Sequence, residues 1–407
     1  MILVSVVIPY YDAQAPLDLV LAALELQTWP AARLEVVVSD DGSPTPPMIG
    51  ARPYSTQVVR QDDRGFRAAA ARNRGAKAAG GDVLCFVDGD TVPGPGYVTA
   101  MVDAVGGPSP MLAVGRRRHV DLADMTLARL RDWLLDVPGH VPPREHPEPH
   151  WLRDAYSRTN DLADAGDDAY RFVIAAVLTL PRTLFEAVGG FEESFTAYGG
   201  EDWELANRCW LAGAEFTHAR AAVAWHDGPD FAGRAERHSE LKNVEGLAVA
   251  PFITDPAARG HGLIWAQPDV VVALADRGWS DAAVLLTVAS LLRDTDAGIW
   301  LSGARDLEPL TNDPRVHVGE PSADVLRRCR YRCEVTHPLQ LTAASLRALC
   351  SQAPLRLVEG LVVRRTRDLN RGDTQAPPAV VGAAESLEDA GLDLERAWGR
   401  GAKRLFT

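Results

Sequence analysis

The sequence predicts an α/β fold in which a mainly parallel sheet is flanked by helices. Three observations predict it. Short apolar runs alternate with segments of helical spacing, which is the pattern of βαβ units. Two of these runs end in acidic turns, at residues 39–43 (SDDGS) and 88–90 (DGD). The order strand, turn and helix then starts again near residue 269, so we expect a second, smaller and degenerate α/β domain.

Length, composition and charge narrow the function classes. A chain of 407 residues is too long for one ordinary domain. Hydrophobic residues make up 46% and charged residues 24%, which is typical of soluble globular proteins. The net charge of -13 argues against general nucleic-acid binding, which requires a basic face. An acidic enzyme that handles an anionic nucleotide must therefore supply local positive charge from a metal, from arginines or from helix N-termini.

Cysteine usage and hydropathy bear on the compartment. The longest apolar runs, 174–180 and 282–292, are shorter than the ~20 residues that a membrane-spanning helix needs. The chain passes from Met1 directly into a strand, without a signal peptide. We expect a cytoplasmic protein, and peripheral attachment to a membrane stays open. The cysteines are scattered and odd in number, unlike a disulfide framework: Cys85, Cys209, Cys329, Cys333 and Cys350.

The first 82 residues read as strand, helix, strand, strand and helix. The strands are predicted at 3–8, 34–38 and 57–59, and the helices at 17–26 and 64–82. The second helix is rich in alanine, and such small residues let a helix lie close to a sheet or to a nucleotide. Its cations are candidates for contacts with a pyrophosphate: Arg67, Arg72 and Arg74.

A buried strand predicted at 83–87 ends in Asp88-Gly89-Asp90. In open α/β sheets, ligands bind at the carboxyl ends of the strands. Carboxylate oxygens suit hard divalent cations, which offset the charge of a diphosphate. The alternative is a simple turn, because Asp and Gly favour turns for backbone reasons. The chain has no GxxxxGK[ST] loop and no GxGxxG after its first strand, so any nucleotide must be held by carboxylates and a metal.

A second acidic group follows an apolar run at 172–180. A helix around 184–188 stops at Gly189-Gly190, and Gly199-Gly200 then precedes three carboxylates in four residues, Glu201, Asp202 and Glu204. The dipole of the helix predicted at 203–212 accounts for one of them, so the group exceeds what capping requires. His226 follows a strand predicted at 221–224. A lone histidine is more often structural, but this position at a strand end adds weight to a metal-ligand interpretation.

Two other patterns invite a metal interpretation that we consider the weaker one. His140, His146 and His150 lie in a proline-rich stretch, 137–150, which predicts a mobile surface loop that could close over a substrate. Cys329, Cys333 and His337 recur every four residues and could share a helix face. No fourth ligand accompanies them, so ordinary packing is the favoured interpretation.

Six segments in order resemble the family 2 inverting glycosyltransferases of GT-A fold. The resemblance is greatest to the branch with bacterial chondroitin-type polymerases, and it extends to the polypeptide N-acetylgalactosaminyltransferases and β-1,4-galactosyltransferases. It covers roughly residues 1–230. The segments are VSVVIPYYD, VVVSDDGS, ARNRGAKAAGGD, CFVDGDTVP, GGFEESFTAYGGEDWEL and AVAWH.

The resemblance implies a binding site for a UDP-sugar and a divalent cation. In such enzymes Asp88 would face the ribose, and Asp90 and His226 would bind Mn²⁺ or Mg²⁺. An imidazole among the ligands favours manganese over magnesium. The implied UDP-sugar contacts are Pro9, Tyr11, Asp40, Asp41, Arg72, Asp88, Gly89, Asp90 and Trp203.

The resemblance also implies the reaction. Asp202 would act as general base on an acceptor hydroxyl, Glu201 would touch the sugar or the acceptor, and Trp203 would offer a ring for stacking. The product would be inverted, and the transferred group would be a hexose or N-acetylhexosamine from UDP, moved to a glycan, peptide or small-molecule acceptor. Two alternatives stay open: a nucleotidyltransferase, and a sugar-nucleotide-binding or assembly protein without turnover.

The second half predicts a domain without a site of its own. We place the catalytic domain at 1–262, the degenerate GT-A-like domain at 263–372, and a linker with a C-terminal helical tail at 373–407. Ser302-Gly303 stands where the first half has Asp40-Asp41, and no DxD motif follows. A scaffold is the favoured role, for homodimerisation, for the acceptor or for covering the first domain. The tail reads as a linker at 373–381, an acidic helix at 383–394 and a basic end at 396–404.

Overall fold

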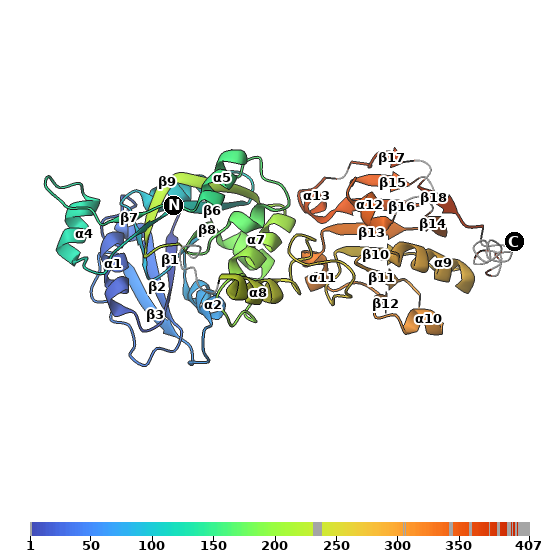
Figure 1. The fold of residues 1–407 in the computed structure, drawn as a ribbon, viewed down its shortest axis with the longest axis horizontal. Helices are drawn as coiled ribbons and strands as arrows, with labels where there is room; N and C mark the ends of the chain where they lie inside the picture. Colours follow the sequence, from blue (N-terminus) through green and yellow to red (C-terminus); the bar gives the residue numbers. More distant parts are fainter. Residues whose placement is uncertain are drawn as a thin grey trace. The chain divides into compact units, whose positions relative to one another are not determined.

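The chain forms two compact units, which we describe separately. The computed structural model describes residues 2–230, 238–303, 305, 307–341, 345–357, 360–373, 375–380, 383–388, 392, 394 and 397. The units are Met1–Val249 and Ala250–Thr407, drawn from blue to yellow-green and from yellow to red in Figure 1. The division thus falls after residue 249, where the sequence suggested 262.

The first unit alternates strands with helices, as the sequence predicts (Figure 1). Its strands are β1 (Val4–Tyr10), β2 (Leu34–Asp40), β3 (Ser55–Arg60), β4 (Val83–Val87), β5 (Thr91–Pro93), β6 (Met111–Val120), β7 (Glu145–His146), β8 (Val177–Pro181) and β9 (Glu215–Asp227). Its helices are α1 (Gln14–Leu24), α2 (Ala68–Ala78), α3 (Tyr97–Val105), α4 (Leu127–Leu134), α5 (His150–Arg158), α6 (Arg182–Val188), α7 (Glu201–Leu211) and α8 (His238–Val249), with short 3₁₀ turns η1 (Ala31–Arg33) and η2 (Ala169–Phe172).

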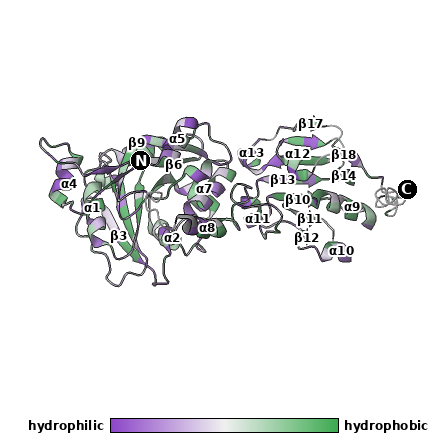
Figure 2. Ribbon diagram, viewed as in Figure 1, coloured by the Kyte–Doolittle hydropathy of each residue, from purple (hydrophilic) through white to green (hydrophobic). Residues whose placement is uncertain are grey.

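One mixed sheet organises this unit, in the order β3-β2-β1-β4-β8-β6-β9-β5, with β7 paired to β6. The first four strands are parallel, and β8 runs antiparallel to both β4 and β6. The continuous apolar runs of β1 and β4 are buried almost throughout. Many residues of the central strands carry the hydrophobic colour in Figure 2. The mainly parallel α/β fold is confirmed, and strand β9 starts earlier than the predicted 221–224.

Small residues bring α2 against the sheet. A Cβ at Gly75 would lie 2.5 Å from Cγ1 of Val7 and 3.3 Å from Cβ of Ser39. The hydroxyl of Ser39 donates to the Ala71 carbonyl oxygen at 2.6 Å, from strand to helix. The alanine-rich helix therefore lies as close to β1 and β2 as the sequence predicts, and this close packing fixes the position of Arg72 in its second turn.

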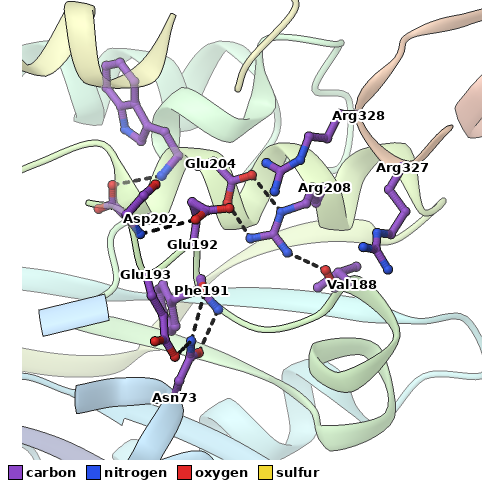
Figure 3. Close-up of polar contacts among 12 residues, drawn as sticks. Asn73, Val188, Phe191, Glu192, Glu193, Asp202, Glu204, Arg208, Arg327 and Arg328 are labelled. Atoms are coloured by element: carbon purple, nitrogen blue, oxygen red, sulfur yellow. Dashed lines mark hydrogen bonds and ion pairs between the residues drawn. The ribbon is translucent and has the colours of Figure 1, made fainter. Parts of the chain in front are cut away.

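A buried ion pair anchors α7. Arg208 donates from Nε to Glu204 one turn earlier at 2.7 Å, makes a second bond to the same carboxylate, and donates to the carbonyl of Val188 at the end of α6 (Figure 3). Both charged side chains are almost fully buried. Glu204, one of the three predicted carboxylates, is thus a structural residue, which leaves Glu201 and Asp202 for the site.

The second unit repeats the first half of this sheet. Its strands are β10 (Val270–Leu274), β11 (Ala297–Leu301), β12 (Val316–Val318), β13 (Tyr331–Val335), β14 (Leu339–Leu341), β15 (Leu355–Leu357), β16 (Leu361–Arg365), β17 (Ala379–Val380) and β18 (Ala384–Ser386). Its helices are α9 (Asp281–Leu292), α10 (Glu308–Thr311), α11 (Ala323–Arg328), α12 (Leu346–Cys350) and α13 (Thr366–Asn370).

The two sheets share an order and the sense of each pairing. The larger sheet of the second unit runs β12-β11-β10-β13-β16-β15-β17. Strands β12, β11, β10 and β13 are parallel and β16 is antiparallel to β13, which matches β3, β2, β1, β4 and β8. Helices α9 and α11 occupy the places of α1 and α2 in chain order. A second α/β region follows the first, as predicted, and its topology is that of a repeat.

The strand ends of the second unit are closed by an internal ion pair. Asp276, two residues beyond β10, is fully buried. Its carboxylate accepts from Nε of Arg305 at 2.7 Å and from the hydroxyl of Ser302 at 2.9 Å. Burial alone would raise the pKa of Asp276, but the bonds from Arg305 and Ser302 hold it below its usual value. At this edge an arginine of the chain supplies the counter-charge of the buried carboxylate.

Two expectations for the second half are wrong. Cys333 lies in strand β13 and Cys329 at the end of α11, so they share no helix face; the run YRCEV around Cys333 pairs with two neighbouring strands. Residues 384–386 form strand β18, which pairs with β14, so the predicted acidic helix does not begin at 383. Tertiary pairing outweighs the local helix preference there.

The basic end at 396–404 lies outside the described residues, apart from 397. Among the described residues, no helix is both long and apolar enough to cross a bilayer.

We expect Gly75→Ala to lower the free energy of unfolding by about 1–3 kcal/mol, because the added methyl group must push α2 away from β1. The matched control is Gly246→Ala in α8, where the new Cβ meets nothing within 4 Å and the better helix former should stabilise by up to about 1 kcal/mol. Urea titrations followed by tryptophan fluorescence measure both. Equal midpoints for the two variants would contradict the close packing of α2.

Candidate active site

A cavity of about 940 Å³ opens in the first unit at the carboxyl ends of β1 and β4. Most of the residues predicted from the sequence line it: Pro9, Tyr11, Asp41, Arg72, Asp88, Gly89, Asp90, Glu201, Asp202 and Trp203. Asp40 and His226 are not among the lining residues. The chain thus gathers segments that are more than a hundred residues apart around one space.

The DxD segment meets His226 through strand pairing. Thr91 in β5 pairs with His226 in β9, and this register brings Nδ1 of His226 to 3.1 Å from Oδ1 of Asp90. Burial alone would raise the pKa of Asp90, but the bond and the charge of His226 hold it below its usual range. Gly89 runs close to β1, because a Cβ there would lie 3.3 Å from the carbonyl oxygen of Pro9.

His119 packs against His226, the imidazole partner of Asp90. It lies in β6 next to β9, is buried, and packs its ring edge-on against that of His226 with centroids 5.4 Å apart. Its Nδ1 donates to the carbonyl of Gly228 at 3.1 Å. Burial and the charge of Arg117 lower the pKa of His119 to about 4, so the ring that faces His226 is neutral.

Arg72 joins the two acidic segments. It is only 4% exposed, and its guanidinium donates to Asp88 at 2.8 Å and to Glu201 at 2.9 Å. Burial works against its charge, but the two carboxylates raise the pKa of Arg72 above its ordinary value. It also lies 5.4 Å from the ring centroid of Phe191. Arg72 is therefore held by carboxylates, and its first role is to fix Asp88 and Glu201 relative to each other.

Asp202 is the second residue of α7, which follows a turn of two glycines. Gly199 and Gly200 precede the helix with φ values of +96° and +92°, which favour glycine. A Cβ at Gly200 would also lie 2.5 Å from Cγ2 of Val249. The Asp202 carboxylate accepts from the backbone N–H of Trp203 at 2.8 Å and from that of Ala175 at 3.4 Å, and it is half-buried at the cavity wall.

The surroundings of Asp202 suit a base. Burial and the charge of Glu201 raise the pKa of Asp202 to about 7, although Arg72 opposes the shift, and Glu245 adds to it. A carboxylate with a pKa near neutrality accepts a proton better than an ordinary one does. Glu201 and Asp202 both line the cavity, but Glu201 is paired with Arg72, whereas the carboxylate of Asp202 accepts from backbone N–H groups.

The two acidic residues predicted at the end of β2, Asp40 and Asp41, have different surroundings. Asp41 lines the cavity and accepts from Gln61 at 2.5 Å and from the backbone N–H of Arg67 at 2.8 Å; burial raises the pKa of Asp41. Asp40 is fully buried and accepts from both the hydroxyl and the N–H of Ser43. Asp40 shapes the turn and does not reach the cavity.

The same wall includes residues that sequence reasoning missed. Lys242 of α8 lies 5.6 Å from the ring centroid of Trp203 and bonds Glu245 at 2.6 Å. Residues 171–176, from the end of η2 up to β8, also line the cavity. Tyr198 belongs to a segment that the resemblance had named, and the others come from segments without a motif: Phe66, Arg117, Trp151, Arg171, Phe172, Asp230, Lys242 and Glu245. The one signal in the sequence that could have identified some of them is the presence of aromatic residues close to the motif segments.

Metal ions in proteins are usually held by groups of ligating side chains. No group of three or more His, Cys, Asp or Glu side chains that could hold a metal occurs among the described residues. The histidines of the proline-rich stretch have separate partners: His146 meets Asp121 at 2.6 Å, His140 the Val137 carbonyl, and His150 Arg153. The weaker metal interpretation of that stretch therefore gains no support.

Sequence comparisons address the family. Residues 5–162 match the profile of glycosyl transferase family 2, and residues 165–225 match that of the N-terminal domain of galactosyltransferase. Most of the first unit is therefore similar to glycosyl transferase family 2. This match covers the strand ends with Asp88 and Asp90, and the galactosyltransferase match covers Asp202. The resemblance read from the sequence is confirmed.

Proteins similar to this chain include enzymes of different substrate classes. The validoxylamine A glucosyltransferase of Streptomyces hygroscopicus subsp. limoneus is 33% identical over 245 residues, which are 54% of this chain and 50% of that protein. The chondroitin synthase of Escherichia coli is 27% identical over 256 residues, 59% of this chain and 37% of that one. The chain thus spans half or less of the length of these relatives.

A solved structure, GalNAc-T7 with UDP, GalNAc and Mn²⁺, aligns with 61% of this chain and 49% of its own, with a TM-score of 0.41 and 14% identity.

We expect Arg72→Met to lower the free energy of unfolding by about 3–5 kcal/mol, because it leaves two carboxylates in the site without their shared partner. The control Arg64→Met removes an arginine whose pair with Asp62 is exposed and should change nothing measurable. Thermal denaturation of both variants tests this. A loss no larger than that of Arg64→Met would mean that the bridge between Asp88 and Glu201 does not hold the site.

Proposed function

We propose that the first unit is a metal-dependent, inverting glycosyltransferase that moves a hexose or N-acetylhexosamine from a UDP-sugar to an acceptor hydroxyl. The observation that carries the proposal is the position of Asp202: a carboxylate with a raised pKa lies in the same cavity as Asp88 and Asp90. The similarity to glycosyl transferase family 2 supports the reaction class. The glucosyl and chondroitin relatives support sugar-nucleotide donors without choosing among them.

The donor set at Asp90 fits a divalent cation. A carboxylate and an imidazole with their donor atoms 3.1 Å apart can both turn to one ion, and such mixed ligands suit Mn²⁺ better than Mg²⁺. Asp90 and His226 would hold the ion, which would leave its other positions to phosphate oxygens and water. When bound, the cation offsets the charge that develops on the departing diphosphate.

The chain's own residues then divide the work. Asp41 and the segment from Pro9 to Tyr11 would hold the nucleoside, and Asp88, fixed by Arg72, would meet the ribose. Asp202 takes the proton of the acceptor hydroxyl while the oxygen of that hydroxyl forms a bond to C1 of the sugar. The bond from C1 to the phosphate oxygen breaks on the opposite face, UDP leaves with that electron pair, and the anomeric centre is inverted. Glu201, paired with Arg72, would touch the sugar.

We expect Asp202→Asn to reduce the release of UDP from UDP-sugars by about 10²–10⁴-fold with Mn²⁺ present, because the amide cannot take the proton. Binding of UDP should persist. Asp154→Asn, at an exposed residue of α5, is the control. A coupled assay for UDP measures the rate across a panel of donors. Release of pyrophosphate would indicate a nucleotidyltransferase, and undiminished release by Asp202→Asn would refute the base.

The rate should rise with pH through about 7, because only the deprotonated form of Asp202 accepts a proton. Glu245→Gln removes a negative charge that favours the protonated form, so its acid limb should move to lower pH. Arg72 acts in the opposite direction and Glu201 in the same direction as Glu245. Profiles of kcat/KM between pH 5 and 9 measure the shift. A profile of Glu245→Gln that moves to higher pH would contradict the assignment of the base.

We expect His226→Gln to weaken the binding of Mn²⁺ by at least tenfold in the presence of UDP, because the amide is a poorer ligand than imidazole. His146→Gln is the control, since that ring bonds Asp121 outside the cavity. Electron paramagnetic resonance of free Mn²⁺ measures binding without turnover. Unchanged affinity in His226→Gln would exclude this residue as a ligand.

A further inference from the structure

One wall of the cavity is built from helices and not from strand ends. Segment η2 packs against both α5 and α7, and these three elements carry Trp151, Arg171 and Asp202, which all line the cavity. The strand-end wall with Asp88 and Asp90 is the one that suits the nucleotide and the cation. The helical wall, which holds the base, is therefore the wall that the acceptor meets.

Trp151 offers an unused ring on this wall. Its side chain is 46% exposed, and no ring contact or hydrogen bond of its indole occurs among the described residues. Tyr11, Phe66 and Tyr198 also line the cavity and are exposed, so Trp151 is one of several exposed aromatic residues there, and such a patch indicates a binding surface. An indole face binds the apolar face of a ring compound, while the hydroxyls of that compound stay in water.

The same wall carries a charged side chain, that of Arg171. The other cations of the cavity have carboxylate partners: Arg72 with Asp88 and Glu201, Arg117 with Asp230, and Lys242 with Glu245. Arg171 is exposed, and its guanidinium has no ion pair or hydrogen bond within the described part of the chain. A single cation without a partner, on the wall that holds the base, is a site for an anion.

We propose that the acceptor is a ring compound that bears an acidic group, with its ring on Trp151 and its carboxylate or phosphate on Arg171. The inference rests on the proposed glycosyl transfer and adds the substrate class. Arg171 disfavours a cationic acceptor, because like charges repel, and two other carboxylates of the cavity, Asp230 and Glu245, already have cationic partners. A neutral polyol would leave the guanidinium without a counter-charge. An acidic ring uses both side chains and places a hydroxyl towards Asp202.

The test uses the full chain with UDP and Mn²⁺, so that the nucleotide site is filled, and three probes of one ring size. Methyl β-D-glucuronide carries a carboxylate, glucose 6-phosphate a phosphate, and methyl β-D-glucoside neither. Saturation-transfer difference titrations give the dissociation constants. We expect at least one acidic probe to bind about tenfold or more tightly than the glucoside, as expected for a hydrogen bond between charged groups. Which acid binds better distinguishes a carboxylate from a phosphate.

Three variants assign the effect to residues. Arg171→Gln should remove the preference for the acid, and Arg171→Lys should keep part of it. Trp151→Ala should weaken all three probes by a similar factor. The matched control is Arg153→Gln: this exposed arginine of α5 pairs with Asp154 and lines a separate cavity of about 330 Å³, and its loss should leave the preference intact.

Equal binding of the acidic and neutral probes, or binding of none, overturns the proposal. A preference that survives Arg171→Gln, or that disappears in Arg153→Gln, also overturns it, because the acid then binds elsewhere. These outcomes are independent of the transfer reaction, which the assay of UDP release with Asp202→Asn addresses. A chain that releases UDP through Asp202 but binds all three probes alike keeps the glycosyltransferase function and loses this acceptor class.

Discussion

The paired bonds of Arg72 are the constraint on which the candidate site depends. One guanidinium joins α2, the end of β4 and the start of α7, which are otherwise separate in the chain. Its position follows from Gly75, since only a helix without a Cβ at that place lies so near β1. Gly75 therefore determines the position of Arg72, and Arg72 in turn determines the positions of Asp88 and Glu201 at the cavity. A buried charge of this kind is costly unless every partner is in place, so the loss of either carboxylate partner should destabilise the site.

The electrostatics of α7 follow from that constraint. Glu204 is bound to Arg208 and Glu201 to Arg72 (Figure 3 for Glu204), so two of the three carboxylates at the start of the helix have a fixed partner. Asp202 has only backbone donors and is the carboxylate whose proton affinity rises. Similar residues in adjacent positions thus acquire different chemistry from their partners, and sequence alone does not distinguish them.

Much of the first unit could be predicted, because its signals are local. Apolar runs gave β1, β2 and β4, and the acidic turns marked the cavity edge. The prediction failed where tertiary partners decide: Asp40 turns inward to Ser43, residues 384–386 join a strand, and Trp151, Arg171 and Lys242 reach the cavity from segments without a motif. Helix α8 has ordinary amphipathic composition, and only its packing near Trp203 reveals that it borders the base. Such contacts depend on the fold, and no pattern of residue spacing in the sequence indicates them.

The closed strand edge of the second unit has a consequence for how the two units respond to their surroundings. Asp276 has a counter-charge from the chain itself in Arg305, so that edge needs no bound cation to balance its carboxylate. The first unit keeps Asp90 and Asp202 at an open cavity, so its stability increases by mass action with any ligand that binds there. One arginine of the chain thus does for the edge of the second unit what a bound cation would do at Asp90.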